Sequence, residues 1–234
     1  MLSKNCLFCH GELEMQVSWS SFFTKDEGQT LCTICKNQLA EIKGETCDIC
    51  DRPLEQLDPQ YVINNRCNDC IRWEEDPEWK GYLHKNTSLF LYNDFLKDLI
   101  SQFKFRGDYE LVKAFSKPLQ EKVGNYDYFV PIPLSSERHF ERGFNQSEAL
   151  IRAAGKEPTQ LLQRKHSEKQ SKKSRMDRIY IAQVFELIEQ TYFRGKTILL
   201  IDDIYTTGST LRHAAKILKN AGAAEVCSLT LARS

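Results

Sequence analysis

Two adjacent carboxylates, Asp202 and Asp203, follow four apolar residues in the stretch ILLIDDIYTTGSTL (198–211). Neighbouring acids repel each other, and burial at the end of an apolar strand costs them hydration, so the pair needs a partner that shares its charge. A ligand with two hydroxyl groups can do this by donating hydrogen bonds to the carboxylates. We therefore take Asp202 and Asp203 as the first candidate binding residues.

The loop that follows supplies the second half of a binding site. It consists of Thr206, Thr207, Gly208, Ser209 and Thr210, and it leads into a predicted helix. Backbone N–H groups at a helix N-terminus attract anions, glycine permits the tight turn, and the hydroxyls add donors. The loop is not a Walker loop, because no Gly-Lys pair precedes its Ser and Thr residues. A phosphate cradle beside a pair of diol acceptors indicates a sugar phosphate.

A second kind of chemistry lies in the cysteines. Eight of the nine come before residue 71 and form four CxxC pairs, separated by 22, 11 and 16 residues. One CxxC turn presents two thiolates to a metal ion, and two such turns complete a tetrahedral four-thiolate zinc site. Two structural zinc ions are therefore predicted, with eight ligands: Cys6, Cys9, Cys32, Cys35, Cys47, Cys50, Cys67 and Cys70.

The pairing of the CxxC turns is less constrained. Sequential pairing is favoured, because the 11 residues between Cys35 and Cys47 suit a linker between two units, but crossed pairing remains open. Each unit then ends in a helix-like run, NQLAEIKGE (37–45) or IRWEED (71–76). Disulfides and redox thiols are the alternatives. Disulfides are rare in cytoplasmic proteins, and four redox pairs in so small a region would be unusual.

The net charge of zero hides an asymmetry. Residues 1–80 carry 8 Lys and Arg and 15 Asp and Glu, a net charge of −7, whereas residues 81–234 carry a net charge of +7. Each zinc ion held by four thiolates makes the first part more negative by about 2 further charges. This part therefore lacks the clustered cations that bind nucleic-acid phosphates, and we expect it to support the fold or to dock a protein.

The rest of the chain is typical of an α/β protein with a parallel sheet and flanking helices. Apolar runs predict strands at 126–134, 196–202 and 225–233, and helical spacing predicts helices at 91–105, 145–154 and 210–222. The continuous apolar run before Asp202 indicates a strand that is covered on both faces. Asn145 is suited to cap its helix, Gly222 to end the last helix, and Cys227 to lie in the core.

The segment WEEDPEWKGY (73–82) predicts a linker or turn on the solvated surface, since it combines an acidic run with Pro77 and Gly81. We place a domain boundary here, with a zinc module at residues 1–80 and a second domain at residues 81–234. No apolar run approaches the roughly 20 residues of a membrane span, and the first residues lack the features of a signal peptide. We therefore expect a cytoplasmic protein.

The stretch LLIDDIYTTGSTL resembles the phosphoribosyl pyrophosphate (PRPP) motif of type I phosphoribosyltransferases. Together with the CxxC pairs, four further stretches make nearly the whole chain similar to the ComF/GntX family: KFRGD (104–108), VPIPLSSER (130–138), RGFNQ (142–146) and spaced residues of 161–185. This resemblance implies a type I phosphoribosyltransferase-like fold. It also implies that the acidic pair holds the ribose 2′- and 3′-hydroxyls of PRPP with its Mg²⁺, and that the loop 206–210 binds the 5′-phosphate.

The resemblance extends the candidate site to other loops. Four residues would face the pyrophosphate of PRPP: Pro131, Ile132, Pro133 and Leu134. Arg142, Asn145 and Gln146 lie close by in sequence and would bind or orient the ligand, although helix capping explains Asn145 equally well. If a transfer reaction occurs, Asp202 and Asp203 would also be its catalytic residues, stabilising an oxocarbenium-like ribose.

The run from Arg164 to Arg178 carries seven Lys and Arg and two Asp and Glu, with no Phe, Tyr or Trp. It corresponds to the mobile catalytic hood of phosphoribosyltransferases. Three interpretations remain open: a solvated loop, a pyrophosphate clamp by Arg164, Lys165 or Arg178, and a contact with a nucleic-acid backbone. In the last case, stacking on bases would have to come from elsewhere in the chain.

The family resemblance links the chain to DNA uptake during natural transformation. The leading hypothesis is a protein that binds PRPP or a related phosphoribosyl ligand and handles incoming single-stranded DNA. Its zinc module would dock the family's competence helicase (ComFA-like), with a peripheral position at the inner face of the membrane as a second expectation. The alternatives are an active phosphoribosyltransferase in nucleotide salvage and a structural adaptor with a vestigial PRPP site. The sequence defines no nucleobase pocket, so the acceptor stays open.

Overall fold

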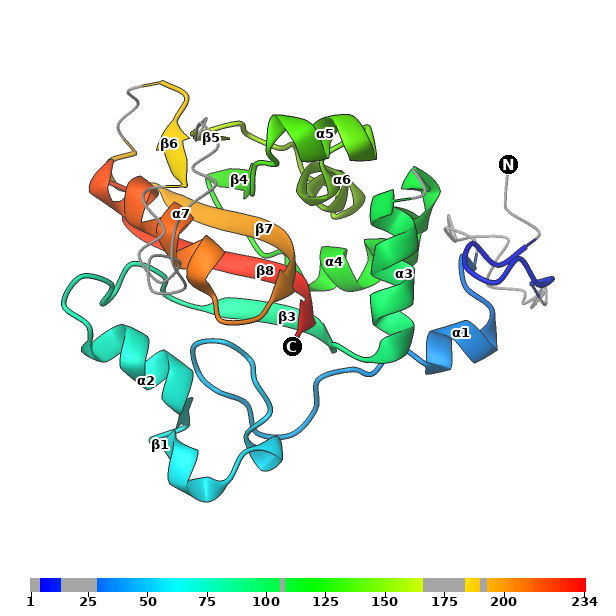
Figure 1. Cartoon of the computed structure of the whole chain (residues 1–234), viewed down its shortest axis with the longest axis horizontal. Coiled ribbons are helices and arrows are strands. Elements are labelled where there is room, and N and C mark those ends of the chain that lie inside the picture. Colours follow the sequence, from blue (N-terminus) through cyan, green and yellow to red (C-terminus); the bar gives the residue numbers. More distant parts are fainter. Residues whose placement is uncertain (1–4, 14–28, 106–107, 166–183, 190–192) are drawn as a thin grey trace, which may run out of the picture.

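The computed structural model describes residues 5–13, 29–105, 108–165, 184–189 and 193–234 of the 234-residue chain (Figure 1). Within these residues, four parallel strands form the central sheet in the order β3-β8-β7-β4. The strands are β3 (Asn86–Leu91), β4 (Tyr128–Pro131), β7 (Thr197–Tyr205) and β8 (Glu225–Arg233). β4 lies at an edge, where the missing N–H group of Pro131 costs no ladder hydrogen bond.

β3 was not among the predicted strands, because buried polar residues interrupt its apolar pattern. Asn86 and Ser88 are both buried and bond to each other and to β8. The Ser88 hydroxyl lies 2.9 Å from that of Thr230, and the Ser228 hydroxyl donates to Asn86 Oδ1 at 2.8 Å. These bonds satisfy the polar groups inside the sheet, so the strand is stable there without an apolar run.

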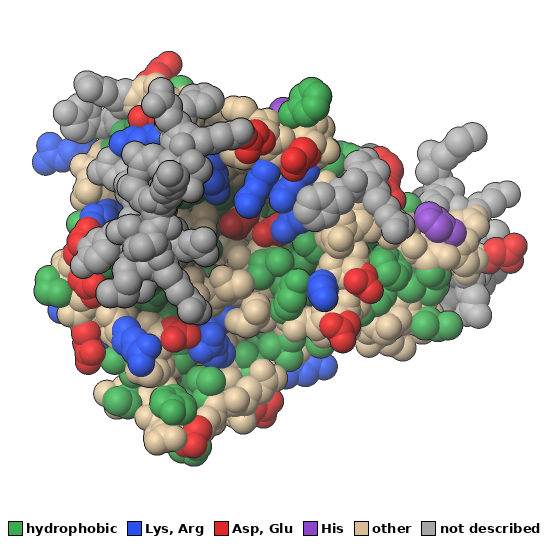
Figure 2. Space-filling model, in the orientation of Figure 1, with side chains coloured by type: hydrophobic (Ala, Val, Ile, Leu, Met, Phe, Trp, Pro, Cys, Tyr) green, Lys and Arg blue, Asp and Glu red, His purple; other side chains and the backbone are tan. Residues whose placement is uncertain are grey.

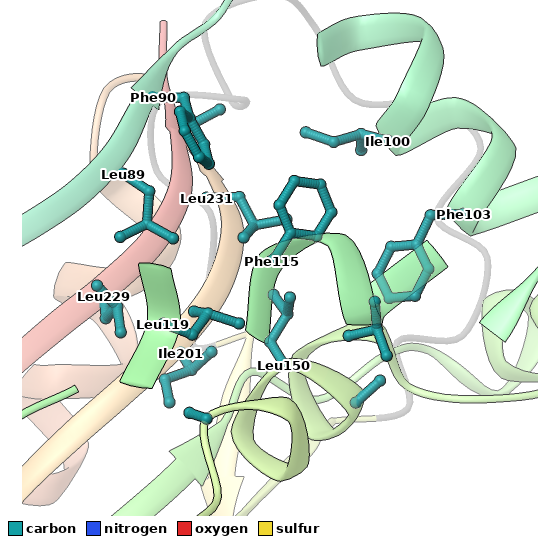
Figure 3. Packing of buried hydrophobic residues seen from close by; sticks show 14 of the residues in the cluster. Leu89, Phe90, Ile100, Phe103, Phe115, Leu119, Leu150, Ile201, Leu229 and Leu231 are labelled. Carbon is teal, nitrogen blue, oxygen red and sulfur yellow. The ribbon is translucent and has the colours of Figure 1, made fainter. Parts of the chain in front are cut away.

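Helices cover both faces of the sheet, as the continuous apolar strands require. One face carries α3 (Asp94–Phe105), the 3-10 helix Tyr109–Phe115, α4 (Ser116–Lys122) and α6 (Gln146–Ala153). Figure 3 shows their apolar side chains packed against Ile201, Leu229 and Leu231 of the sheet. The other face carries α7 (Ser209–Asn220), which packs on Ile198 and Leu200. The alternation along β7 thus divides its side chains between two cores.

Three smaller elements complete this part of the molecule. α5 (Ser136–Arg142) follows β4, and β5 (Leu162–Arg164) pairs with β6 (Phe185–Leu187) in an antiparallel hairpin. The predicted helices at 91–105, 145–154 and 210–222 are confirmed with slightly shorter bounds. Asn145 caps α6, Gly222 has φ +96° after α7, and Cys227 is buried. No helix in the described part of the chain is both long and apolar enough to cross a membrane.

The cysteine-rich part contains short elements: α1 (Thr33–Asn37), the 3-10 helices Leu54–Gln56 and Pro59–Tyr61, the paired strands β1 (Val62–Ile63) and β2 (Arg66–Cys67), and α2 (Asn68–Glu75). The helix expected at residues 37–45 is wrong. After α1 the chain runs along the edge of β3, where the N–H of Leu91 donates to Ala40 at 2.8 Å. The unpaired backbone groups of an edge strand outweigh the local helical pattern here. The second helical run is confirmed as part of α2.

The segment 73–82, expected to be a solvated linker or turn, lies against α7. Glu74 pairs with Arg212 at 2.9 Å, and Glu78 pairs with Lys216 at 2.9 Å. The ring of Trp79 lies against that of His213, with centroids 4.5 Å apart. Residues 77–81 form turns and most of the segment is exposed, as expected, but two of its acids pair with cations of α7 and fix it to that helix.

Candidate functional site

Asp202 and Asp203 lie inside β7, whose pairing with β8 continues to Tyr205 and Arg233. The strand was expected to end at Asp202, and it is longer because β8 offers a partner along its whole length. Figure 2 shows a hollow on this face of the molecule, with acidic side chains at its floor and Lys and Arg side chains beside them. The sheet edge therefore presents charged groups to solvent in a recess, where open α/β sheets bind ligands.

Each of the two carboxylates has a contact within the protein. Asp202 Oδ1 accepts hydrogen bonds from the backbone N–H of Asp203 at 3.0 Å and from the Ser147 hydroxyl at 3.4 Å. Asp203 forms an ion pair with Lys104, at the end of α3, and both of these side chains are 15% exposed. The two acids are thus held by groups from α3 and α6, which lie on one face of the sheet.

Burial and, after it, the negative charge of Asp203 together raise the pKa of Asp202 to about 7, against the lowering effects of the Asp203 backbone N–H, Lys104 and Ser147. A carboxyl group with this pKa exists in both protonation states near neutral pH. A ligand that donates hydrogen bonds, or a cation that binds with it, favours the ionised state. Asp202 is therefore poised to lose a proton when such a ligand arrives.

The loop 206–210 leads from β7 into α7, as the sequence predicts. Gly208 is the N-cap of α7 with φ +79°, and α7 begins at Ser209. Thr206, Thr207 and Thr210 are exposed, and the Thr207 hydroxyl accepts a hydrogen bond from the N–H of Ser209 at 3.4 Å. α7 has 12 residues, and its dipole favours an anion at this end. The structure thus brings the predicted anion loop next to the acidic pair.

Pro131 ends β4, residues 132–134 form the loop that follows, and two predicted site residues hold this loop in place. Asn145 Nδ2 donates to Ile132 O at 3.1 Å, while its Oδ1 accepts from Ser147 N at 2.9 Å. Arg164 Nε donates to Pro133 O at 3.1 Å. The carboxamide of Asn145 is therefore engaged as a helix cap and a loop anchor, which is the capping interpretation offered by the sequence.

Gln146 and the two arginines lie around the acids. Arg142 Nη1 donates to Gln146 Oε1 at 2.8 Å, and Gln146 Nε2 donates to Phe144 O at 3.2 Å. Burial lowers the pKa of both Arg142 and Arg164, and the negative charge of Asp202 acts on each in the opposite direction. The two arginines thus place positive charge beside the carboxylates of the acidic pair.

Sequence reasoning missed Lys104 and Ser147 as site residues. Lys104 belongs to the KFRGD stretch, but only the packing of α3 against the sheet brings it to Asp203. Ser147 is the second residue of α6, and nothing in its local sequence marks it as different from other residues of the helix. Arg178 lies outside the described residues, as does most of the basic run, so the three interpretations of that run stay predictions.

The cysteines form two separate groups, paired sequentially as expected. The first contains Cys6, Cys9, Cys32 and Cys35, the second Cys47, Cys50, Cys67 and Cys70, and within each group the sulfur atoms lie within 4.8 Å of one another. The sulfur atoms of Cys50 and Cys67 are 3.6 Å apart, and those of Cys9 and Cys32 are 3.7 Å apart. Metal–sulfur bonds of about 2.3 Å in a tetrahedral site separate sulfurs by about 3.8 Å. Each group can therefore hold a metal ion.

The two groups differ in exposure. All four cysteines of the second group are buried, whereas Cys9 is exposed and Cys32 is half-buried in the first. We expect a chelator to remove metal in two phases, with one equivalent leaving at least about tenfold faster than the other, because release from a buried site requires local unfolding. A colorimetric chelator assay measures both phases. Cys9→Ser should abolish only the fast phase, and two equivalents leaving in one phase would contradict the prediction.

Comparison with known proteins extends these observations along the chain. The Phosphoribosyl transferase domain family matches residues 142–234, from the end of α5 to β8. The chain is 37% identical to Competence protein ComFC of Bacillus subtilis (strain 168), covering 98% of this chain and 95% of that protein. It is 36% identical to Competence protein ComFC of Streptococcus pneumoniae, covering 97% of this chain and 99% of that protein. It is also 28% identical to DNA utilization protein YhgH of Salmonella typhi, with 87% and 97% covered.

The domain match covers the acidic pair and the anion loop, and the parallel sheet with flanking helices is the type I phosphoribosyltransferase-like fold. The two ComFC proteins match both this fold and the cysteine-rich part that precedes it. An identity of more than a third along nearly the whole length shows that the chain belongs to the ComF/GntX family, among the ComFC competence proteins.

Proposed function

We propose that this protein binds PRPP, or a closely related phosphoribosyl ligand, together with Mg²⁺ in the recess at the end of β7, and that it serves DNA uptake in competence. One observation carries the proposal: two carboxylates in β7 lead within a few residues into an anion loop at the N-terminus of α7. This places diol acceptors beside a phosphate cradle on a parallel sheet.

In this proposal the carboxylates of Asp202 and Asp203 accept hydrogen bonds from the two ribose hydroxyls, and residues 206–210 bind the 5′-phosphate. Residues 131–134 face the pyrophosphate, with Arg142 and Arg164 supplying positive charge. Gln146 and Asn145 orient these groups through the contacts described above. Arg178, outside the described residues, would join them from the hood. Mg²⁺ bound to the pyrophosphate neutralises its charge.

Lys104 sets a condition on ligand binding. Its ammonium group pairs with Asp203, so the ligand's hydroxyls and Mg²⁺ must share Asp203 with it or displace it. A cation that holds the second carboxylate until the ligand arrives keeps two neighbouring acids from repelling each other. Lys104 therefore joins the site residues that we propose.

The competence role rests on the relatives. Two are named as competence proteins and a third as a DNA utilization protein. We propose that the present protein handles single-stranded DNA in a cytoplasmic setting, peripheral to the membrane, and that residues 1–80 form a module that docks a ComFA-like helicase. The four-thiolate sets fit zinc better than the harder cations, because soft thiolates select zinc.

The test is calorimetry of PRPP binding with Mg²⁺, with and without a single-stranded oligonucleotide. We expect binding in both cases and a change in affinity when DNA is present. A lack of PRPP binding in both cases would contradict the proposal and favour an adaptor with a vestigial site. Release of pyrophosphate with one member of a panel of nucleobases would instead favour nucleotide salvage.

The raised pKa of Asp202 predicts a pH dependence of this binding. Because the ligand favours the ionised carboxylate and the free group has a pKa of about 7, PRPP affinity should rise between pH 6 and pH 8. Near pH 7, binding should release about half a proton, measured by calorimetry in buffers of different ionisation enthalpy. The phosphates of PRPP also titrate in this range, so Asp202→Asn serves as the control. Equal proton release in both proteins would refute the assignment.

A further inference from the structure

Three successive carbonyl groups, at the last residue of β7 and the first two residues of the anion loop (206–210), accept hydrogen bonds from side chains outside the loop. Arg233 Nη1 donates to Tyr205 O at 3.2 Å and to Thr206 O at 3.1 Å. Trp73 Nε1, on α2 in the cysteine-rich part, donates to Thr207 O at 3.0 Å. Two side chains thus fix the backbone of residues 205–207 on one side.

These contacts set the direction of the loop's N–H groups. In a trans peptide the C=O group points opposite to the next N–H group, and the described residues contain no cis peptide. Anchored carbonyls at 205, 206 and 207 therefore turn the N–H groups of Thr206, Thr207 and Gly208 to the opposite side of the loop. Within the described part of the chain, no backbone carbonyl accepts a hydrogen bond from the N–H of Thr207 or Gly208. These donors are available to an anion.

Both anchoring side chains are tied to the second cysteine group. Arg233 Nη2 donates to Cys50 Sγ at 3.4 Å, so one guanidinium bridges a cysteine sulfur and the anion loop. Trp73 lies on α2, which begins directly after Cys67 and includes Cys70. Arg233 is only 3% exposed and packs over the ring of Tyr205, 4.9 Å from its centroid. The bridge is therefore buried, and solvent does not compete for its hydrogen bonds.

The first turn of α7 is held from the same side. Arg212, which is fully buried, pairs with Glu74 of α2 at 2.9 Å and lies 5.2 Å from the ring centroid of Trp73. The helix whose N-terminus faces the proposed phosphate is thus fixed to the element that also carries Trp73. A rigid arrangement of donors binds an anion more tightly than a mobile one, because less order is lost on binding.

We propose that Arg233 and Trp73 are positioning residues of the anion loop, and that metal binding by Cys47, Cys50, Cys67 and Cys70 controls phosphoribosyl-ligand affinity through them. Thiolates held by a metal stay negatively charged and accept hydrogen bonds from a guanidinium, whereas free thiols are weak acceptors. Loss of the metal loosens Arg233 and α2, and the loop amides lose their common direction. This inference rests on the proposed function of the loop.

The first test removes single anchors. Trp73→Phe keeps an aromatic ring on Arg212 but removes the N–H donor, and Arg233→Lys keeps the charge but loses the planar fork that reaches the loop carbonyls and Cys50 together. We expect PRPP affinity to fall about tenfold for Trp73→Phe and further for Arg233→Lys. Trp79→Phe is the matched control, because Trp79 packs on His213 and on the ring of Trp73, and a Phe keeps an aromatic ring there while the Trp73 N–H donor to the loop stays in place. Unchanged affinity in both anchor variants would overturn the proposal.

The second test needs no ligand. Hydrogen exchange of a peptide covering residues 205–210 should be faster in Cys50→Ser and Arg233→Lys than in the wild type. Cys9→Ser is the control, because Cys9 belongs to the first cysteine group. That group lies beside α3, where Phe8 contacts Phe95. Equal exchange in all four proteins would refute the coupling. If the wild type binds no PRPP, the proposed function fails, and this measurement still decides whether the loop is coupled to the second cysteine group.

A third measurement separates positioning from a general loss of structure. With cobalt in place of the native metal, PRPP should shift the thiolate-to-cobalt absorption of the wild type, because the ligand acts on Cys50 through the loop and Arg233. The shift should be lost in Arg233→Lys and kept in Cys9→Ser. A shift that persists in Arg233→Lys would contradict the bridge.

Discussion

Replacing Asp202 and Asp203 together by Asn is expected to lower PRPP affinity by at least about 100-fold and, at the same time, to stabilise the fold. The loss follows because Asn keeps the shape of each side chain but not the charge that ribose hydroxyls and Mg²⁺ require. The gain follows because burial and the charge of Asp203 raise the pKa of Asp202 to about 7, so ionisation of Asp202 opposes folding. Calorimetry with PRPP and thermal unfolding measure the two effects.

The pH dependence of this gain has a definite sign. The stability of the wild type is highest when Asp202 is protonated in both states and declines as the pH rises from about 4 to about 7. The advantage of the variant should therefore be small at pH 4 and reach at most about 4 kcal/mol above pH 7, since one pKa unit corresponds to about 1.36 kcal/mol. Loss of the ion pair with Lys104 reduces this figure.

The matched control changes the same net charge elsewhere. Asp94 and Asp98 are exposed on α3, and replacing both by Asn should leave PRPP affinity and stability nearly unchanged. If the Asp202 and Asp203 variant bound PRPP like the wild type, the site assignment would be wrong. If it bound nothing but also unfolded, the loss of binding would be explained by structure alone.

The parts of the fold that the sequence predicts are those set by local pattern. The apolar strands, the amphipathic helices and the CxxC turns are each indicated by a pattern that spans only a few residues. The structure has them at the expected places. The acidic pair and the loop 206–210 are also contiguous in sequence, so their meeting needed only a strand, a turn and a helix. The same holds for Asn145 and its cap.

The parts that could not be predicted depend on contacts between distant residues. The sequence of β3 has no apolar strand pattern, and only its pairing with β8 supplies hydrogen-bond partners for the side chains of Asn86 and Ser88. The local sequence of residues 73–82 does not show that two of its acids have partners, because these partners, Arg212 and Lys216, lie far away in sequence on α7. Lys104 reaches Asp203 across 99 positions of sequence, and no spacing in either stretch records that contact.

The cysteine-rich part also has a larger role than its composition indicates. Its net charge of −7 indicated a structural or docking role. In the structure, the sulfur of Cys50, the indole of Trp73 and the carboxylate of Glu74 form hydrogen bonds with the phosphoribosyltransferase-like fold. Arg233 and Arg212 place two buried cations against this acidic part, where a four-thiolate metal site would otherwise leave negative charge unpaired. The opposite charges of the two parts of the chain thus meet in one interface.

Replacing Gly208 by Ala is the second change with a large expected effect. A Cβ atom at this position would lie 2.2 Å from Tyr205 Oη and 2.5 Å from Tyr205 Cζ. The ring cannot move aside easily, because Tyr205 is 2% exposed and lies under the guanidinium of Arg233. Gly208 also has φ +79°, which costs an alanine about 1 kcal/mol or more. We expect a stability loss of about 2–4 kcal/mol and a loss of PRPP affinity of at least about 100-fold.

Two companion variants separate the backbone strain from the clash. Gly155 has φ +72° with no atom within 4 Å of an added Cβ, so Gly155→Ala should show the strain alone, about 1 kcal/mol, with unchanged PRPP affinity. Tyr205→Leu removes the clashing ring atoms, so adding Gly208→Ala in that background should also cost only about 1 kcal/mol. The double-mutant cycle then yields a favourable coupling of 1 kcal/mol or more between the two positions, as expected for residues in contact. If Gly208→Ala cost no more than Gly155→Ala and bound PRPP normally, neither the packing of Tyr205 beneath the loop nor the direction of the loop amides would control ligand binding.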